Sequence, residues 1–300
     1  MKTEKKIISV IVPVYQGKEF IAGFFEAWRN QSLDKDLVEL VIADNNSSDG
    51  SYEMLYGLLQ DHPELVVISY ADKQSSYAAR NAAVAKSTAP FLLFTDIDCV
   101  PKVNWLASAF SHTEANKQNA LVAGKVSLFP CDVNFNVYEW FDSQSFLKTD
   151  QLAENRVAVT ANLLVSRGLY DELEGFRELT SGSDIDFSKR AKAASCQFIY
   201  APEMNVGHPA RSTCFEISKK IDRVAKGKAE HIRFNQSFRI KSSFALKHIA
   251  ALLVQHLFWK DMMTTWREKR FSWRWKFRYS FISLQFWIRY RIKILHELYK

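Results

Sequence analysis

Two aspartates that are one residue apart, Asp96 and Asp98, directly follow the apolar run of residues 90–95. In an extended segment, alternate side chains point to the same side, so the two carboxylates face the same way. Mg²⁺ and similar cations that bind phosphates take one or two carboxylates together with water and phosphate oxygens. The pair therefore offers ligands for a metal and phosphate site, although an acidic pair in a loop is usually only solvated.

A second pair of carboxylates, Asp184 and Asp186, follows Gly182 and opens a helical pattern over residues 183–194. Side chains two positions apart on a helix point about 200° apart, so only one of the two can face a substrate. Of the two, we favour Asp184 as the acid that faces the substrate, because it stands at the mouth of the helix. The alternative is that both acids only stabilise the helix N-terminus through its dipole.

The elements that position these acids alternate between strand and helix, which is typical of an α/β fold with a parallel sheet and covering helices. The sequence predicts strands at residues 7–15, 38–43, 65–70 and 90–95, and helices around 20–28, 51–60 and 77–86. In such sheets, ligands bind at the carboxyl ends of the strands, where the polar residues 44–51 and 96–98 fall. Beyond Trp105 we expect mixed or antiparallel additions, with strands at 121–129, 157–165 and 197–201 and helices at 183–194 and 211–228.

Five short motifs occur in order along the chain: SVIVPVY at residues 9–15, VIADNNSSDGS at 41–51, YAARNAA at 77–83, FTDIDCVP at 94–101 and GSDIDF at 182–187. In these motifs and their order, the first two-thirds of the chain resembles family-2 glycosyltransferases of the GT-A fold. The resemblance implies a Rossmann-like, mostly parallel sheet with helices on both faces. It also implies an inverting enzyme that transfers a sugar from a nucleotide-sugar donor, most commonly a UDP-sugar, to a lipid-linked or glycan acceptor in cell-surface polysaccharide assembly.

The same resemblance implies a donor-binding role for residues in the first four motifs. Pro13 and Tyr15 end the first strand, and Tyr15 matches the position whose ring packs on the nucleotide base. Asp44 matches the acid that hydrogen-bonds this base, and Arg80 matches a contact to the base or the phosphate. Asp96 matches the residue that faces the ribose or the sugar.

For the metal and the chemistry, the resemblance points to later residues. Asp98 matches a ligand of Mn²⁺ or Mg²⁺ that bridges the donor diphosphate. His208 matches a histidine that touches the metal or the diphosphate, with a solvated loop histidine as an equal alternative. Asp184 matches the catalytic base, although the family usually has Glu where this chain has Ser183. Arg211 is a further candidate for a phosphate contact.

The composition describes a folded chain with an uneven distribution of charge. The 300 residues are 47% hydrophobic and 24% charged, with 10 Gly and 7 Pro, which excludes disordered and low-complexity chains. Residues 1–240 hold 27 Lys/Arg against 30 Asp/Glu, whereas residues 241–300 hold 13 against 3 and five of the eight Trp. We therefore expect a catalytic domain at residues 1–240 and an amphipathic helical tail at 241–300. The four Cys show no metal-ligand spacing, so we expect reduced, buried thiols in a cytoplasmic protein.

The aromatic and basic tail predicts an anionic partner that has an apolar layer. Trp and Tyr favour the headgroup region of a bilayer, and Lys and Arg gain from an anionic leaflet. No apolar run reaches the roughly 18 residues of a membrane span. We therefore expect an in-plane anchor at the inner face of the cell membrane, with an amphipathic helix over residues 244–266.

Three other interpretations are open from the sequence. The tail aromatics could pack on the catalytic domain as ordinary core, with the basic faces in water. The chain could be a non-catalytic nucleic-acid-binding protein that grips phosphates and stacks bases. The acidic cluster argues against that interpretation, and no nucleic-acid partner is expected. A sugar nucleotidyltransferase would carry a Gly-rich stretch after the first strand, where this chain has PVYQGK at residues 13–18.

Overall fold

The computed structural model describes residues 6–115, 119–235 and 256–300, and the chain divides into two compact units. The first, called the sheet unit, comprises Met1–Leu128, Thr149–Glu178 and Ser183–Pro209. The second, called the helical unit, comprises Phe129–Lys148, Leu179–Gly182 and Ala210–Lys300. The predicted boundary between residues 240 and 241 lies outside the described residues.

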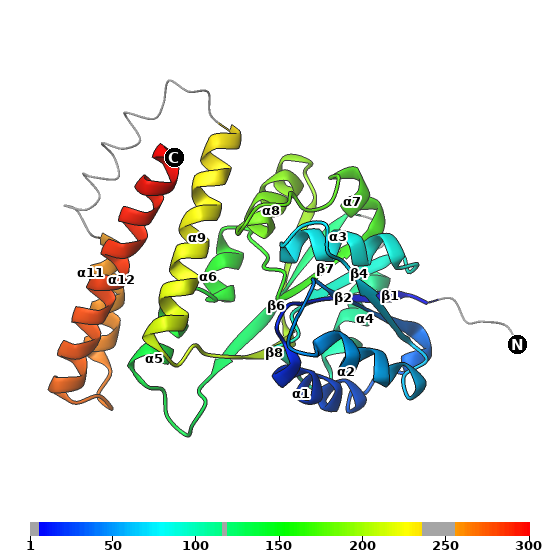
Figure 1. Ribbon diagram of the computed structural model, residues 1–300, viewed down its shortest axis with the longest axis horizontal. Helices are drawn as coiled ribbons and strands as arrows, with labels where there is room; N and C mark the ends of the chain where they lie inside the picture. Colours follow the sequence, from blue (N-terminus) through cyan, green and yellow to red (C-terminus); the bar gives the residue numbers. More distant parts are fainter. Residues whose placement is uncertain (1–5, 116–118, 236–255) are drawn as a thin grey trace, which may run out of the picture. The chain divides into compact units, whose positions relative to one another are not determined.

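Within the described residues, the sheet unit is built on an eight-stranded sheet with the order β3-β2-β1-β4-β7-β6-β8-β5 (Figure 1). Strands β3, β2, β1 and β4 are parallel neighbours, whereas β7 is antiparallel to β4 and β6, and β5 is antiparallel to β8. The α/β class and the predicted antiparallel additions are confirmed. The bounds are β1 (Ile8–Val14), β2 (Val38–Asp44), β3 (Leu65–Ser69), β4 (Phe91–Thr95), β5 (Val100–Pro101), β6 (Ala120–Phe129), β7 (Asn162–Ser166) and β8 (Gln197–Pro209).

Three of the later elements differ from their predicted bounds. The strand expected at residues 157–165 begins only at Asn162, because a turn closed by the Asn162 N to Val159 O hydrogen bond precedes it. The strand expected at 197–201 continues to Pro209, since its later part pairs with β5. The helix expected at 211–228 begins at Cys214 and ends at Asn235.

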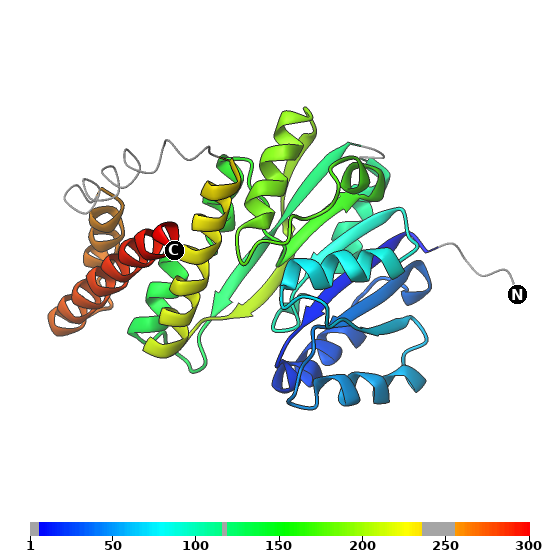
Figure 2. The ribbon, with the colours of Figure 1, turned by 45° about the horizontal axis from the view of Figure 1, so that its top comes forward.

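Helices cover both faces of the parallel part of the sheet. In Figures 1 and 2, α3 (Ser76–Lys86) lies on one face, over β1 and β2, while α1 (Lys18–Arg29) and α2 (Ser51–Gly57) lie on the other. Because both faces are covered, every residue of β1 and β2 is buried. Further helices of this unit are α4 (Trp105–Ala115), α6 (Thr149–Glu154), α7 (Arg167–Glu172) and α8 (Ser183–Ala193).

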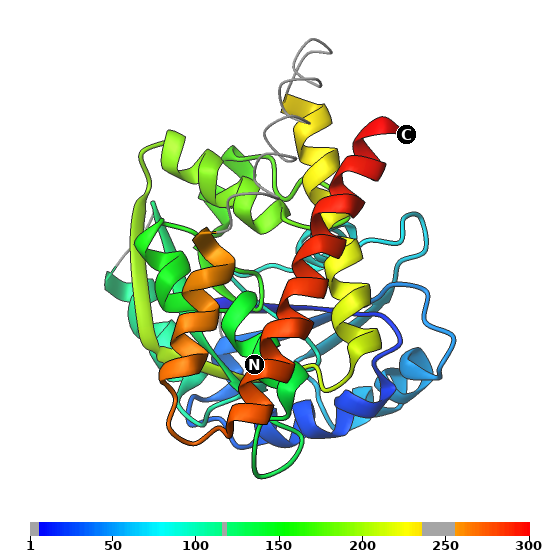
Figure 3. The same cartoon turned by 90° about the vertical axis from the view of Figure 1, so that its left-hand side faces the viewer.

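The helical unit packs a helix from the middle of the chain against helices from its end. Helix α12 (Trp273–Tyr299) runs beside α9 (Cys214–Asn235), with α11 (His256–Arg267) next to α12 (Figure 3). One core joins α12, α9 and α5 (Val137–Ser145) and contains Val137, Trp140, Phe141, Ile217, Ile221, Tyr279, Ile282 and Phe286. Part of the tail aromatics therefore packs as ordinary core.

Close contacts tie α9 to the short segment Leu179–Gly182 of the same unit. Thr180 donates hydrogen bonds from N and from Oγ1 to the two carboxylate oxygens of Glu230, each 2.6 Å long. A Cβ on Gly227 would collide with the backbone of Ser181, so this helix position requires glycine. The segment is thereby held against α9.

All four cysteines are free thiols, as expected. The expectation that they are buried is correct for Cys99 and Cys196 and wrong for Cys131 and Cys214, which lie at the surface. Among the described helices, none is long and apolar enough to cross a membrane. Residues 244–255 of the predicted amphipathic helix lie outside the described residues.

Candidate active site

The motif at residues 44–51 shapes the loops at the carboxyl ends of β1 and β2. Asp49 accepts hydrogen bonds from Lys18 N and from Ser51 N and Oγ, at 2.6–3.0 Å. Ser51 Oγ in turn accepts a hydrogen bond from Gly17 N at 3.1 Å. Gly50 has a φ of 86°, a left-handed conformation that glycine adopts without strain. Through these hydrogen bonds, Asp49 and Ser51 of the motif hold the loop after β1 in place.

Asp44 is the last residue of β2 and pairs in register with Val14, the last residue of β1. Its side chain is 2% exposed, and Oδ2 accepts a hydrogen bond from Ser47 N at 3.0 Å. Oδ1 is buried and has no partner among the described residues, which is unfavourable unless a ligand donates to it. The Tyr15 side chain is 53% exposed, whereas Pro13 is buried inside β1. A buried acceptor and an exposed ring therefore lie at the same sheet edge.

The Asn45 amide is used by the fold. Its Nδ2 donates to Tyr70 O and to Lys73 O, both at 2.9 Å, and its Oδ1 accepts from Ser75 N at 2.9 Å. Ser75 caps the N-terminus of α3. Asn45 therefore fastens the end of β2 to the loop that leads into α3.

Helix α3 brings Arg80 to the first carboxylate after β4. The Arg80 side chain is 3% exposed, its Nη2 forms an ion pair with Asp96 Oδ1, and its Nη1 donates to Ser76 O at 3.3 Å. Arg80 Nε is buried and has no acceptor among the described residues. Arg80 thus neutralises Asp96, whereas Asp98 has a different partner.

The antiparallel pairing of β5 with β8 places His208 next to Asp98. Because Val100 pairs with Gly207, the residues just before β5 meet those that follow Gly207. His208 Nε2 lies 3.4 Å from Asp98 Oδ2. Asp98 Oδ1 is buried and, in the part of the chain that the structure describes, accepts no hydrogen bond. Two of the predicted metal-site residues are therefore neighbours.

The tautomer of His208 decides what this site can hold. Nδ1 lies 2.7 Å from Pro209 O. Because a carbonyl oxygen only accepts, Nδ1 carries the hydrogen, and a neutral ring presents the Nε2 lone pair to Asp98. Two facing acceptors need a proton or a cation between them. The donor set of a carboxylate and an imidazole fits a divalent cation.

Cys99 lies in the same group but is a poor metal ligand. One potential ligand atom from each of Asp96, Asp98 and Cys99 falls within 4.8 Å of the others. Burial, together with the charges of Asp98 and Asp96, raises the pKa of the Cys99 thiol well above its usual range. Since metal binding needs the thiolate, the oxygen atoms are the ligands that this group offers.

The two acids of the last motif have different surroundings at the start of α8. Asp186 is 3% exposed, and its two oxygens accept from Arg177 Nη1 at 2.7 Å and from Arg190 Nε at 2.8 Å. Asp184 is partly exposed, and its Oδ1 accepts from the Tyr77 hydroxyl at 3.1 Å. Among the described residues, no cationic side chain forms an ion pair with Asp184.

Arg211 lies in the helical unit and binds Asp142 of the same unit. Its N and Nη1 donate to Asp142 Oδ2 at 3.0 and 3.1 Å, and Asp142 is buried. The charge of Arg211 is therefore engaged within the helical unit, and its contact to a phosphate stays a prediction.

Sequence reasoning missed the roles of Tyr77 and Asn81, which lie in the same motif as Arg80. Asn81 donates to Phe176 O at 2.8 Å and accepts from the Tyr170 hydroxyl at 2.5 Å, so it fastens the segment before α8. Tyr77 reaches Asp184. The spacing of three residues between Tyr77 and Arg80, which puts both on one helix face, was the available signal.

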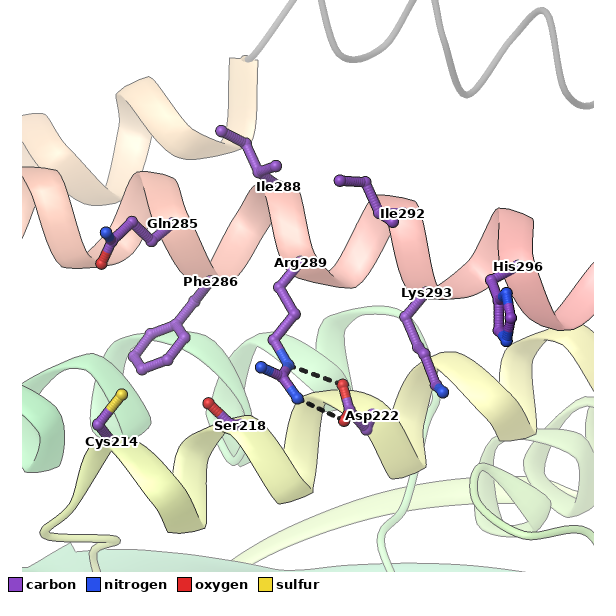
Figure 4. A pocket seen from close by; sticks show the side chains of 10 residues that line it. All are labelled: Cys214, Ser218, Asp222, Gln285, Phe286, Ile288, Arg289, Ile292, Lys293 and His296. Atoms are coloured by element: carbon purple, nitrogen blue, oxygen red, sulfur yellow. Dashed lines mark hydrogen bonds and ion pairs between the residues drawn. The ribbon is translucent and has the colours of Figure 1, made fainter.

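A groove of 660 Å³ lies between α9 and α12 of the helical unit. Figure 4 shows Arg289 of α12 directed at Asp222 of α9, with N–O distances of 2.8 and 2.6 Å. The hydrogen bonds from Arg289 lower the pKa of Asp222. The only carboxylate among the lining residues is therefore paired, and no motif residue lines the groove, so we assign no sugar-transfer chemistry to it. The lining residues are Cys214, Ser218, Asp222, Gln285, Phe286, Ile288, Arg289, Ile292, Lys293 and His296.

The fold is shared with a solved glycosyltransferase. The structure is similar, with a TM-score of 0.65 and 17% sequence identity, to the mannosyltransferase PcManGT from Pyrobaculum calidifontis, solved in complex with GDP-Man and Mn²⁺. The similarity covers 98% of this chain and 88% of that chain. The protein therefore has the GT-A fold of glycosyltransferases, which confirms the expected fold.

Sequence similarity identifies the family of the chain. The profile of glycosyl transferase family 2 matches residues 9–173, which contain four of the five motifs. Glycosyltransferase AglE of Haloferax volcanii is 32% identical over 232 residues, or 77% of this chain and 75% of AglE. The processive diacylglycerol beta-glycosyltransferase of Mycoplasma genitalium is 30% identical over 95 residues, or 31% of this chain and 27% of that protein. The chain belongs to glycosyl transferase family 2 and is a glycosyltransferase, as its motifs predicted.

Proposed function

We propose that this chain is a metal-dependent, inverting hexosyltransferase that moves a sugar from a UDP-sugar to a lipid-linked or glycan acceptor in cell-surface polysaccharide assembly. The observation that carries this mechanism is the contrast between three carboxylates. Asp96 and Asp186 are neutralised by arginines, whereas Asp184 has no cationic partner among the described residues. A carboxylate without such a partner can accept a proton from a substrate hydroxyl.

The donor binds, in this proposal, at the carboxyl ends of β1, β2 and β4. The buried Oδ1 of Asp44 accepts a hydrogen bond from the imino N–H of uracil, and the exposed ring of Tyr15 covers the base. Asp96, held by Arg80, faces the ribose or the sugar, and Arg80 Nε offers a donor to an oxygen of the same molecule. Because PcManGT was solved with GDP-Man, GDP-sugars are the main competitor to test.

Asp98 and His208 are proposed to hold Mn²⁺ or Mg²⁺. The facing Oδ2 and Nε2 atoms and the unpartnered, buried Oδ1 of Asp98 support this assignment in the described part of the chain. A bound divalent ion neutralises the charge that develops on a diphosphate leaving group. The two acids of the Asp-x-Asp pair thus divide their roles, because Arg80 satisfies Asp96 and leaves Asp98 for the ion.

Asp184 is proposed to act as the general base. As the acceptor oxygen bonds to the anomeric carbon, its proton passes to Asp184. The bond from the anomeric carbon to the phosphate oxygen breaks on the opposite side, and its electron pair leaves with the diphosphate. This single displacement inverts the anomeric configuration. Asp186 is a poor base, because Arg177 and Arg190 engage its two oxygens.

A donor screen tests this function. Thermal unfolding of the full chain is measured with UDP-, GDP- and dTDP-sugars, each with and without Mn²⁺, because a bound donor stabilises by mass action. We expect a UDP-sugar to raise the melting temperature only with Mn²⁺, and Asp98→Ala to lose this shift. NMR of the product reports the anomeric configuration. Stabilisation by no nucleotide-sugar, or retention of configuration, would count against the proposal.

We further propose that α12 rests on the anionic inner face of the cell membrane, near a lipid-linked acceptor. Helix α12 has two apolar faces. Its inner face includes Tyr279 and Phe286 and is buried in the helical unit. The outer face, called the α12 stripe, consists of exposed side chains at spacings of four and seven residues: Trp273, Phe277, Phe281, Ile288 and Ile292. At 1.5 Å per residue, the stripe is about 30 Å long.

The charge beside the α12 stripe supports a membrane as its partner. Arg274 and Arg278 are exposed and follow Trp273 and Phe277 directly in the chain, so they flank the stripe. Each cation near an anionic leaflet contributes about 1 kcal/mol. Apolar and cationic groups thus occur together, as in helices that lie in the interface. Because Phe286 is buried in the helical unit, this aromatic ring of the tail is not part of the α12 stripe.

Vesicle co-sedimentation of the full chain tests the α12 stripe. The double variant Phe277→Ser/Phe281→Ser is compared with Tyr56→Ser, which removes an exposed ring from the sheet unit. We expect the double variant to lose binding to anionic vesicles, and the wild type and Tyr56→Ser to bind them at low salt and to release them at high salt. Equal sedimentation of all three, a change of oligomeric state in the double variant, or binding of oligonucleotides in place of vesicles would overturn the proposal.

A further inference from the structure

The Tyr77 hydroxyl group contacts the carboxylate that we propose as the base. Tyr77 is the second residue of α3, and its hydroxyl donates to Asp184 Oδ1 at 3.1 Å, across 107 residues of sequence. Ile185 N also donates to this oxygen, at 2.9 Å. One oxygen of Asp184 is therefore held from two directions.

The Tyr77 ring is itself fixed in place. Its side chain is buried, the Arg80 guanidinium lies 5.4 Å from the ring centroid, and the Phe176 ring lies 5.8 Å away. Arg80 carries the ion pair to Asp96. Tyr77 thus links the proposed donor-binding carboxylate, through Arg80, to the proposed base.

We propose that Tyr77 is a positioning residue that orients Asp184 for proton transfer, an inference that rests on the proposed function. With Oδ1 engaged by the Tyr77 hydroxyl and by Ile185 N, Oδ2 is the oxygen that receives the proton of the acceptor hydroxyl. The new bond forms between the acceptor oxygen and the anomeric carbon, and the diphosphate departs with the electron pair of the broken bond. Tyr77 exchanges no proton in this step.

The charges around the pair agree with an orienting role. Arg80, which lies next to the Tyr77 ring, is neutralised by Asp96. Asp186, which follows on α8, is neutralised by Arg177 and Arg190. A neutral hydroxyl is therefore the side-chain group that directly contacts Asp184 among these neighbours. A misplacement of a reacting group by about 1 Å can lower a rate by up to about 10²-fold. Loss of one of two contacts to Oδ1 should cost less, about 10-fold.

The substitution Tyr77→Phe tests this role, because it removes only the hydroxyl and keeps the buried ring. In the full chain with Mn²⁺, we expect kcat to fall about 10-fold, while donor KM and the donor-induced thermal shift stay at the wild-type values. The double variant Tyr77→Phe/Asp184→Asn should be no slower than Asp184→Asn alone, since Tyr77 acts only through Asp184.

Tyr279→Phe is the matched control. It also removes only the hydroxyl of a buried tyrosine, here one in the core of the helical unit, and we expect its kcat per folded molecule to equal that of the wild type. A wild-type kcat for Tyr77→Phe, or additive losses in the double variant, would overturn the inference alone. Full turnover of Asp184→Asn would instead overturn the base assignment of the proposed function.

Discussion

Replacing Asp186 by Asn removes a buried charge that two arginines share, whereas replacing Asp184 by Asn removes a charge that has no cationic partner among the described residues. Removing one partner of a buried ion pair costs about 3–5 kcal/mol. The Arg177 and Arg190 side chains are 35% and 20% exposed, so both regain some water, and we expect about 2–3 kcal/mol for Asp186→Asn. For a domain of about 150–250 residues, this corresponds to a melting temperature about 4–12 °C lower.

Asp184→Asn should have little effect on the melting temperature and a large effect on kcat. Both acids lie in the first turn of α8, so each substitution loses the same interaction with the helix dipole, about 0.3–1 kcal/mol, and each serves as the control for the other. Loss of the base should lower kcat about 10²–10⁴-fold. Calorimetry and a transfer assay of both variants measure the two effects. If Asp184→Asn unfolded as early as Asp186→Asn and still turned over normally, our division of roles would be refuted.

Three further predictions concern the sheet unit. Asp98→Ala should abolish transfer that depends on Mn²⁺ and leave circular dichroism unchanged; full activity of the wild type in excess EDTA would argue against this metal role. Asp44→Ala should raise donor KM about 10- to 100-fold with little change in kcat, as expected for a lost hydrogen bond to a charged group of about 1.5–3 kcal/mol, and steady-state kinetics measure both constants. Burial opposes ionisation of Glu39, but hydrogen bonds from Ser9 and Thr88 outweigh it and lower its pKa. The resulting stability is present above the unfolded pKa and is lost as the pH falls, so urea unfolding should show a larger loss for Glu39→Gln at pH 7 than at about pH 3.

Local patterns were sufficient to predict the parallel half of the sheet and the acids at its edge. The apolar runs of β1, β2 and β4 are buried on both faces, so they stand out from their surroundings, and Asp44, Asp96 and Asp98 follow directly. The neighbours of these acids were not predictable from a window of sequence. His208 reaches Asp98 only because two residues of β5 pair with the end of β8, and Tyr77 meets Asp184 across 107 residues.

The tail shows a second limit of pattern analysis. Its aromatic and basic composition was evident, but composition does not say which aromatic ring lies inside. Tyr279 and Phe286 are buried because α5, from the middle of the chain, packs against them. The sequence between the strands expected at residues 121–129 and 157–165 did not predict this helix. Asn45 is a similar case, because its amide is used by backbone groups of a loop about 30 residues away.

The shared core of α5, α9 and α12 also sets the order in which the protein can mature on the ribosome. Trp140 and Phe141 are synthesised more than a hundred residues before the Tyr279 and Phe286 rings that cover them. At roughly 5–20 residues per second, the α5 segment waits roughly 7–30 s with these side chains uncovered. During that interval it is a candidate client for chaperones. A premature stop codon between α5 and α12 would leave the α5 segment uncovered for good, so such truncated chains should be cleared by proteolysis or aggregate.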